Sequence, residues 1–303
     1  MDFELTIAHR VCPSLSKTAI GFSDKPSMVR ATAESLAASL HEFGKTTRLI
    51  AILDGCEESY ESLFQQTFSS VKNVHLEIIK TASIGNQATY AKQNEVLLEA
   101  QNTRLAYFSE DDYIYATNAF SAMADMLSRP DVDFVTPLDH PDRYNHVLSA
   151  PKSAEVKVSP YCHWRTVGTS CLTFMTTSKI LHECSPFLKT FGTGAMDGTM
   201  WLGLTKEDVR DFSKVIPPAI AYICGRDKPF GYYMPLCAWK HHGMKILTTR
   251  KYKLLQPIPS LAVHLSSTSL PLHSSSIFAI PDEKANALLK ETELAYLELL
   301  NRQ

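Results

Sequence analysis

The sequence predicts an α/β fold with a mostly parallel central sheet flanked by helices. Short apolar segments alternate with longer segments whose apolar residues recur at helical spacing, and turn residues separate the two kinds. Strands that alternate with helices of about ten to fifteen residues imply βαβ units, in which the strands run parallel. The expected strands are residues 5–11, 47–53, 74–79, 104–108 and 134–137, and the expected helices are residues 27–43, 57–68, 86–100 and 117–127.

The first helix and the strand after it carry clear local signals. Met28, Leu36 and Leu40 recur at helical spacing, and Gly44 follows them as the expected C-cap. The next apolar strand stops at Asp54, which a glycine follows. An Asp-Gly pair is typical of a turn, so the sequence predicts that this strand ends there.

The second half of the chain is less regular. It contains loops rich in aromatic residues and histidine, a strand-like segment at 171–175 and a proline-containing stretch from 257 to 271. A closing amphipathic helix is expected at 283–300.

Length, charge and cysteine usage exclude several classes of protein. The 303 residues suffice for one large α/β domain or two small ones, and the formal net charge of −2 argues against bulk nucleic-acid binding. No apolar run approaches the roughly 20 residues of a membrane-spanning helix, and the first residues do not resemble a signal peptide. Seven scattered cysteines without a CxxC pair favour a reduced compartment and disfavour thiolate-bound zinc. We therefore expect a cytoplasmic protein.

Three consecutive carboxylates directly follow the predicted strand at 104–108. They are Glu110, Asp111 and Asp112. In parallel α/β sheets the ligand crevice lies outside the carboxyl ends of the strands. Mg²⁺ and Mn²⁺ prefer oxygen ligands, so the cluster predicts a divalent-metal site, with a solvated acidic turn as the alternative.

The cluster and the helix before it resemble a known family. Lys92, Gln93 and Asn94 stand where GT-A nucleotide-sugar glycosyltransferases carry an Arg/Lys-x-Asn signature, and the carboxylates resemble a Glu-Asp-Asp variant of their DxD motif. Over residues 1–140 the resemblance lies in the order of the expected strands and helices, and it is to family 2 of these glycosyltransferases. It implies a GT-A-like domain and a metal-dependent, inverting transfer of a sugar from a nucleotide diphosphate donor, with UDP-sugar favoured, to a hydroxyl of a glycan or lipid-linked acceptor.

The resemblance also implies how a metal would be held. The last carboxylate of such triplets is usually the ligand of Mn²⁺ or Mg²⁺, which makes Asp112 the first choice. Glu110 and Asp111 would then serve the ribose or metal-bound water, although one alignment gives the metal to Asp111 instead. A late histidine completes many such sites. His264 is the first choice here, and the competing histidines are His241, His242 and His273.

The donor nucleotide has further expected contacts. The resemblance implies that His9 and Arg10, at the end of the first strand, flank the base and that Asp54 accepts a hydrogen bond from uracil. For Asp54 a simple turn is the alternative. Lys92 and Asn94 belong to the same expected donor-binding set.

The acceptor side is expected to use residues from the second half. Asp139, Asp142 and Arg143 form a dense polar run after a strand, and the resemblance places such a region beside the donor sugar and the acceptor. A proline-centred surface turn is the alternative. Trp164 could bind a sugar or belong to the core.

Asp197 is the candidate general base. It lies in a glycine-rich loop that enters a helix, within residues 192–204. Inverting GT-A enzymes resemble this arrangement, and a carboxylate there would deprotonate the acceptor hydroxyl. An N-cap role for the aspartate is the alternative.

These expectations combine into a domain scheme with two rival functions. Residues 1–255 would form the catalytic domain, with a nucleotide-sugar half at 1–140 and an acceptor half at 141–255, while 256–303 would supply a loop and helix that complete the site. Polysaccharide biosynthesis at the inner face of the membrane, with peripheral membrane contact, fits a chain without a membrane-spanning segment. The rivals are a nucleotidyltransferase on a related fold and a non-catalytic sugar-binding protein.

Overall fold

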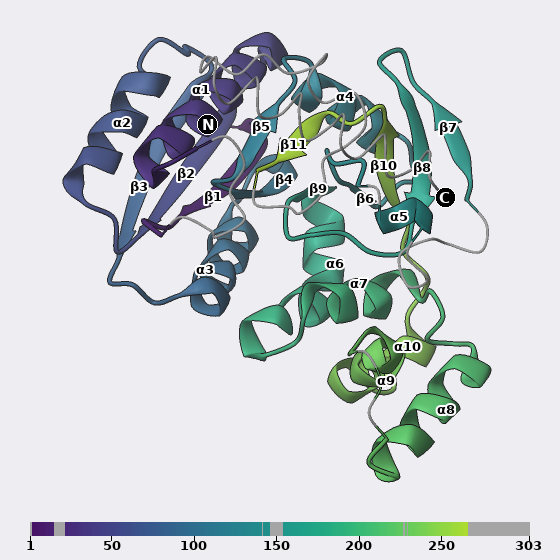
Figure 1. The fold of residues 1–303 in the computed structure, drawn as a ribbon. Helices are drawn as coiled ribbons and strands as arrows, with labels where there is room; N and C mark the ends of the chain where they lie inside the picture. The colour runs from purple at the N-terminus through teal and green to yellow at the C-terminus, as the bar shows by residue number, and fades with distance from the viewer. Residues whose placement is uncertain are drawn as a thin grey trace, which may run out of the picture.

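The computed structural model describes residues 2–14, 22–140, 142–145, 154–226, 228 and 230–265. Within them a nine-stranded sheet has the order β3-β2-β1-β4-β9-β6-β10-β8-β7, and a second sheet pairs β11 with β5 (Figure 1). The strands are β1 Phe3–Val11, β2 Thr47–Asp54, β3 Val74–Thr81, β4 Thr103–Glu110, β5 Tyr113–Tyr115, β6 Phe134–Val135, β7 Val156–Val158, β8 His163–Val167, β9 Phe174–Thr177, β10 Leu254–Ile258 and β11 Ala262–His264.

Ten α-helices and one short 3₁₀ helix accompany the strands in the described part of the chain. They are α1 Lys25–Phe43, α2 Glu58–Phe68, α3 Asn86–Glu99, α4 Ala119–Leu127, α5 Asp142–Asn145, α6 Ser178–Leu188, η1 Phe191–Thr193, α7 Asp197–Thr205, α8 Phe212–Ile223, α9 Phe230–His242 and α10 Lys245–Thr248. No helix among the described residues is long and apolar enough to cross a membrane.

The sheet is parallel in the half formed by the N-terminal part of the chain. The strands β3, β2, β1 and β4 are all parallel neighbours, as alternating strands and helices predict. Beyond β4 most pairings are antiparallel, namely β4 with β9, β9 with β6, β10 with β8 and β8 with β7. The predicted α/β class with a central sheet between helices is confirmed, and the less regular second half is the antiparallel part.

Helices cover both faces of the sheet. One core cluster joins α1, α2 and α4 to side chains such as Ile7 and Leu49, which alternate along their strands with the residues of the other face. The second cluster joins α3, α6 and α7 to Ala8 and Ile50. This alternation along β1 and β2 is what strands buried on both faces show, and it explains why residues 49–53 of β2 read as a continuous apolar run.

The helix ends follow from local chemistry. The Asp24 carboxylate accepts a hydrogen bond from the Ser27 amide at 2.8 Å, and α1 begins directly after this N-cap. Gly44 ends α1 in the left-handed conformation, with φ +64°, and its amide donates to the Leu40 carbonyl at 3.2 Å. The predicted C-cap is therefore confirmed, and a residue with a Cβ would be strained there.

Several predicted bounds differ from the observed ones. The helix expected at 117–127 begins only at Ala119, and the strand-like segment expected at 171–175 is β9, which begins at Phe174. The expected domain boundary between 255 and 256 falls inside β10, so the sheet does not divide there. The closing helix expected at 283–300 lies outside the described residues.

The carboxyl ends of three parallel strands meet at one edge of the sheet. Arg10 on β1 pairs in register with Glu110 on β4, and Asp54 ends β2 on the other side of β1. The small β5–β11 sheet lies beside this edge and pairs Tyr113 with His264. Long-range pairing thus brings the end of the described chain to the residue that follows Asp112.

Candidate functional site

Two adjoining cavities open at this edge of the sheet. The first has a volume of about 470 Å³ and the second about 340 Å³. Arg10, Asn86 and Glu110 line both, so these residues form the wall between them. Further residues of the first cavity are Cys12, Lys25, Asp54, Gly85, Thr89, Asp111 and Asp112, and further residues of the second are Gln87, Cys171, Phe191, Met196, Asp197 and His264.

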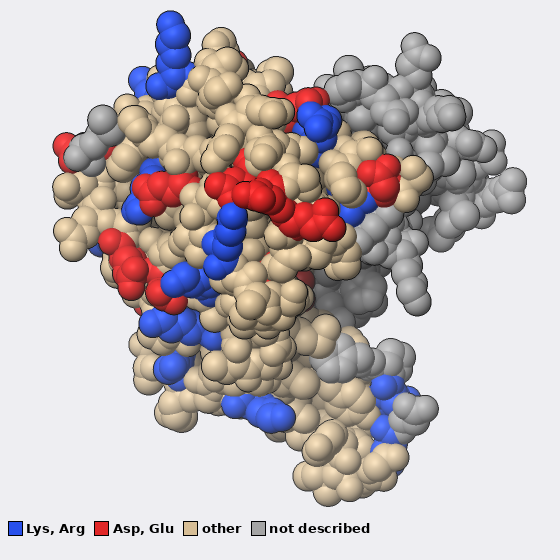
Figure 2. Space-filling view, turned by 90° about the vertical axis from the view of Figure 1, so that its left-hand side faces the viewer, with Lys and Arg blue, Asp and Glu red and all other residues tan. Residues whose placement is uncertain are grey.

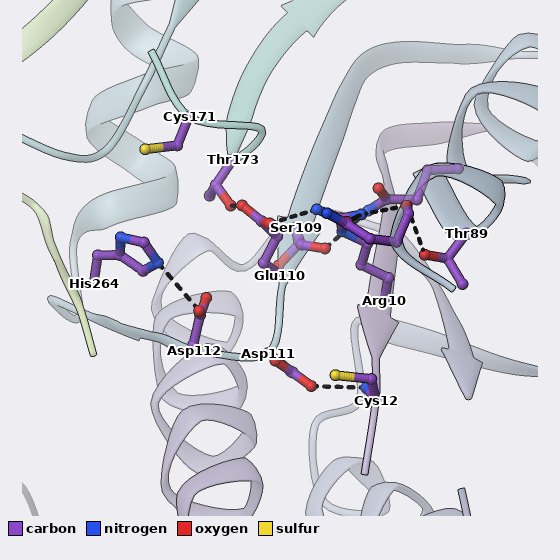
Figure 3. A network of polar contacts seen from close by, with 12 residues as sticks. Arg10, Cys12, Thr89, Ser109, Glu110, Asp111, Asp112, Cys171, Thr173 and His264 are labelled. Carbon is purple, nitrogen blue, oxygen red and sulfur yellow. Dashed lines mark hydrogen bonds and ion pairs between the residues drawn. The ribbon is translucent and has the colours of Figure 1, made fainter. Parts of the chain in front are cut away.

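The shared wall is a partly buried ion pair tied to a helix N-terminus. Nη2 of Arg10 lies 2.5 Å from Oε1 of Glu110, and Nη1 donates to the Asn86 carbonyl at 2.9 Å and also to the Asn86 side-chain oxygen. Oε2 of Glu110 accepts from the Thr173 hydroxyl at 3.0 Å (Figure 3). Burial acts to lower the pKa of Arg10, but the Glu110 charge outweighs it and raises that pKa. These contacts hold the pair where β1, β4 and α3 converge.

The Asp111 side chain bonds to groups of α1 and of the segment after β1, and so helps to hold the fold together. Its Oδ1 lies 2.8 Å from Nζ of the buried Lys25, and its Oδ2 accepts the Cys12 amide at 2.9 Å. Burial raises the pKa of the Asp111 carboxyl, and the Lys25 ammonium opposes that rise. Both carboxylate oxygens are therefore engaged by protein donors.

Asp112 points in a different direction, toward β11 (Figure 3). Its Oδ2 lies 3.1 Å from Nε2 of His264, and the Leu265 amide donates to the Asp112 carbonyl at 2.8 Å. The His264 ring stacks on Tyr113 with a centroid distance of 4.6 Å and an interplanar angle of 9°. Burial acts to lower the pKa of His264, but the Asp112 charge and hydrogen bond raise it. Asp112 lines the first cavity and His264 lines the second, so their contact joins residues of both cavities.

The pair of Asp112 and His264 suits a divalent cation. One carboxylate oxygen and one imidazole nitrogen are common ligands of Mn²⁺, and their facing atoms now share a hydrogen bond whose proton a cation would replace. Among the described residues, no group of three or more His, Cys, Asp or Glu side chains could hold a metal ion. Two protein ligands leave coordination positions for substrate phosphates and water, which is how Mg²⁺ is commonly bound.

Asp54 lines the first cavity, but both of its carboxylate oxygens already accept hydrogen bonds from protein groups. Its Oδ1 accepts from the Thr81 hydroxyl at 2.8 Å and the Ile84 amide at 2.7 Å, and its Oδ2 accepts from the Gly85 amide at 2.8 Å. Burial acts to raise the pKa of Asp54, but these hydrogen bonds hold it below its usual value. Asp54 thereby fixes the loop before α3, and Gly85 supplies the φ of +86° that the loop needs.

Asp197 stands at the first position of α7 and lines the second cavity. The residue before it, Met196, is the N-cap, so the N-cap role weighed for Asp197 is wrong by one position. Its Oδ1 accepts from the Gly198 amide at 2.6 Å. Burial and the nearby Glu110 charge raise the pKa of Asp197 above its usual value. A half-buried carboxylate at a helix start, beside a cavity, is well placed to accept a proton.

Three members of the expected donor-binding set lie outside the lining of the cavities. His9 is buried, and its Nδ1 lies 2.8 Å from the Ser109 hydroxyl; burial lowers the pKa of His9 to about 3. Lys92 is on the surface with Glu95 as its partner, 2.5 Å away. Asn94 is buried and donates to the Tyr90 carbonyl at 3.1 Å, so its side chain belongs to the packing of α3.

Asp139, Arg143 and Trp164 of the expected acceptor set are not among the residues that line the two cavities. Arg143 is buried and donates to the Leu138 carbonyl and to Gln256, at 2.9 and 2.8 Å. Asp139 accepts from Gln256 and from the Tyr144 hydroxyl. These residues tie the segment after β6 to β10. Asp142 begins α5, and its side chain lies outside the described part of the structure.

Trp164 belongs to the core. Its side chain is fully buried, and its indole nitrogen donates to the Ser159 hydroxyl at 3.2 Å. A buried ring offers no face to a sugar, so the sugar-binding interpretation is replaced by the alternative of a core tryptophan.

Sequence reasoning did not select two residues that the structure places in the site. Lys25 pairs with a residue 86 positions away, and Asn86 contacts Arg10 from 76 positions away. Both stand at the first position of a helix. Helix starts that follow parallel strands lie at the ligand edge of the sheet, and that rule is the signal that could have found them.

Comparisons with known proteins give distant structural likenesses. No protein-family model matches the chain, and no curated protein matches it. It is similar to S. aureus TarS, with a TM-score of 0.38 and 11% identity over 60% of this chain and 29% of that one, so it spans less than a third of TarS. For TarS 1-349 the TM-score is 0.43 and the identity 11%, over 79% of this chain and 71% of that one.

A mannosyltransferase is a further structural likeness. PcManGT from Pyrobaculum calidifontis, in complex with GDP-Man and Mn²⁺, has a TM-score of 0.41 and 11% identity over 81% of this chain and 71% of that one. At these TM-scores and identities, neither the activity nor the site residues of these proteins can be assigned to this chain. The function is therefore inferred below from the chain's own residues.

Proposed function

We propose that the protein is a glycosyltransferase that takes a sugar from a nucleotide diphosphate donor in the first cavity and transfers it to an acceptor hydroxyl in the second. One observation carries this proposal. Two cavities of suitable size share the wall of Arg10, Asn86 and Glu110. Asp112 of the first cavity contacts His264 of the second, and the second also holds Asp197, a carboxylate with a raised pKa.

The first cavity fits a nucleotide. Its volume of about 470 Å³ lies within the range of small-molecule sites. The N-terminus of α3, at Asn86, opens on it with the partial positive charge of a helix start, which favours phosphate oxygens. A UDP-sugar is the donor to test first, because the resemblance of the carboxylate triplet to the DxD motif points to UDP.

The structure favours Asp112 over Asp111 as the residue that would hold Mn²⁺ or Mg²⁺. Both oxygens of Asp111 are occupied by Lys25 and Cys12, whereas Asp112 faces His264. The metal would neutralise the diphosphate that leaves when the glycosidic bond breaks. Asp111 would instead hold the first turn of α1 against the carboxylate loop, and so position Asp112.

Asp197 would act as the general base in the second cavity. The acceptor hydroxyl transfers its proton to Asp197 as its oxygen attacks the anomeric carbon, and the diphosphate leaves toward the first cavity. Because the base and the leaving group lie on opposite sides of the shared wall, attack opposite to the leaving group and inversion are the expected outcome. The acceptor we propose is a glycan or lipid-linked glycan of the polysaccharide-building type.

A panel of nucleotide sugars, screened by thermal unfolding with Mn²⁺ or with chelator, tests the proposal. A ligand that binds only the folded protein raises the melting temperature by mass action. The proposal expects at least one nucleotide sugar to stabilise the protein more with Mn²⁺ than with chelator. If no nucleotide sugar stabilises it under either condition, the proposal is wrong.

A further inference from the structure

The helix α8 exposes an apolar face that no part of the described chain covers. Phe212, Ile216, Ile220 and Ile223 recur every three or four residues and so lie along one side of the helix. Their exposed fractions are 53%, 53%, 52% and 82%. We call these four residues the α8 face. Contiguous apolar surface of this kind on a soluble domain usually marks a binding surface.

The opposite side of α8 is already used for packing. Val215, Pro218 and Ala221 are buried there, and α8 packs on α9, which in turn packs on α7. In Figure 1, α8 lies at the lower edge of the molecule, on the far side of α9 from the sheet. The α8 face is thus an outer surface of a lobe that projects below the sheet.

A groove runs beside the α8 face, between α8 and α9. It encloses about 840 Å³, and Tyr222, Leu236 and Trp239 contribute to its largely apolar lining. Arg226 and Lys240 line it as well, and both side chains are exposed. An apolar groove with cations at its margin suits molecules that combine an apolar chain with an anionic head.

The charge in the segment that follows the start of α8 is mostly positive. At that start, Asp211 caps the helix and Asp208 pairs with Lys214 at 2.5 Å, so Lys214 is already neutralised by a protein partner. Between residues 212 and 249 the only acidic residue in the sequence is Asp227, whereas the basic residues are Lys214, Arg226, Lys228, Lys240 and Lys245. The chain as a whole has a net charge of −2, so this segment is basic against an acidic remainder. On the side that Figure 2 shows, the lower lobe displays blue patches among tan atoms, while the red atoms lie higher on the molecule.

We propose that the α8 face and its groove dock on the surface of an anionic lipid bilayer. An interfacial helix buries its apolar residues at the boundary of headgroups and acyl chains, and basic residues beside it are attracted to anionic lipids. The α8 face supplies the first feature, and Arg226, Lys228 and Lys240 supply the second. This surface is separate from the two cavities, and the proposal does not depend on the glycosyltransferase assignment.

Co-sedimentation of the full chain with vesicles tests the proposal. We expect binding to phosphatidylcholine vesicles that contain phosphatidylglycerol, and much weaker binding to phosphatidylcholine alone or at high salt. The double variant Ile216→Gln/Ile220→Gln should lower the partition coefficient by about tenfold or more, since two inserted apolar side chains are lost. The matched control Val156→Gln/Val158→Gln, which changes two exposed valines of β7, should bind like the parent.

Two double variants that each remove two positive charges complete the test. Arg226→Ser/Lys240→Ser should weaken binding to the anionic vesicles, while Lys45→Ser/Lys72→Ser, at exposed positions outside the lobe, should not. Thermal unfolding of each variant shows that its fold is kept. The proposal is overturned if the parent stays in the supernatant with both kinds of vesicle, or if the Ile216/Ile220 variant binds as well as the parent. A further outcome also overturns the proposal. If the parent does not bind vesicles but is a dimer by light scattering, and the Ile216/Ile220 variant is a monomer, the α8 face binds a second copy of the chain instead of a bilayer.

Discussion

Nε2 of His264 lies 3.1 Å from Oδ2 of Asp112, although 152 residues separate them in the chain. The pairing of β11 with β5 creates this proximity, since it sets His264 opposite Tyr113, the residue next to Asp112. The two-stranded sheet thus holds an imidazole on β11 against the carboxylate of the residue just before β5.

The first prediction concerns metal binding by this pair. Asp112→Asn and His264→Gln should each weaken Mn²⁺ binding in the presence of UDP. Loss of an outer-shell partner already costs about 10–100-fold in affinity at many metal sites, so loss of a ligand should cost at least about tenfold. Isothermal titration calorimetry measures the affinity. The matched control His241→Gln should bind Mn²⁺ normally, and an equal loss in that variant would remove His264 from the site.

The second prediction concerns the buried pair of Lys25 and Asp111. Removing one partner leaves an uncompensated buried charge, so Lys25→Met should lower the free energy of unfolding by about 3–5 kcal/mol. Urea unfolding measures this change. Glu77→Gln breaks the exposed pair with Arg48 and should cost at most about 1 kcal/mol. A cost of Lys25→Met no larger than that of the control would contradict the structural role given to Asp111.

The third prediction concerns Asp197 as the base. Asp197→Asn keeps the shape of the side chain but cannot accept a proton, so turnover should fall by about 10²–10⁴-fold with little change in donor affinity. Because burial raises the pKa of Asp197, the acid limb of the parent's pH–rate profile should lie above the usual range of an aspartate. Activity should be lost as the pH falls through this limb, and the variant should lack the limb. A near-normal turnover of the variant would exclude Asp197 as the base.

The fourth prediction concerns Lys206 and the pH dependence of stability. Burial lowers the pKa of Lys206 to about 8 from its ordinary 10.5. Between these values the unfolded chain binds more protons at this group than the folded chain does, so its contribution to the free energy of unfolding rises with pH from about 8 to 10.5. Urea unfolding of the parent and of Lys206→Met over this range measures the difference. The stability of the parent relative to the variant should increase with pH, and a constant difference would contradict the lowered pKa.

Local signals in the sequence predicted the elements well. The apolar spacing of α1 and the glycine after it depend on neighbours within a few residues, and so the helix and its C-cap could be predicted. The site depends on contacts between distant parts of the chain. The sequence named Asp111 and Asp112 as rivals, but only the partners Lys25 and His264 distinguish them, and those partners are set by sheet pairing and helix packing.

The residues that sequence reasoning misplaced share one physical cause. Arg143 was expected at a sugar, and Trp164 either at a sugar or in the core, because polar and aromatic side chains are suited to sugars; both are buried and hydrogen-bonded within the fold. Composition and spacing do not show which side of a short antiparallel strand or one-turn helix will face the core. In the central parallel strands β1, β2 and β4 most residues on both faces are buried, so this question arises only where each of these strands ends.

The most direct test of the account is the release of nucleoside diphosphate from a nucleotide sugar that stabilises the protein, with Mn²⁺ and a panel of glycan acceptors. The account predicts release that needs the metal and an acceptor, that Asp112→Asn abolishes, and that Asp197→Asn slows by about 10²–10⁴-fold. The exposed-site control Lys92→Gln should turn over like the parent, since Lys92 lies outside both cavities. Release that continues with chelator present and with both aspartates replaced would contradict the account.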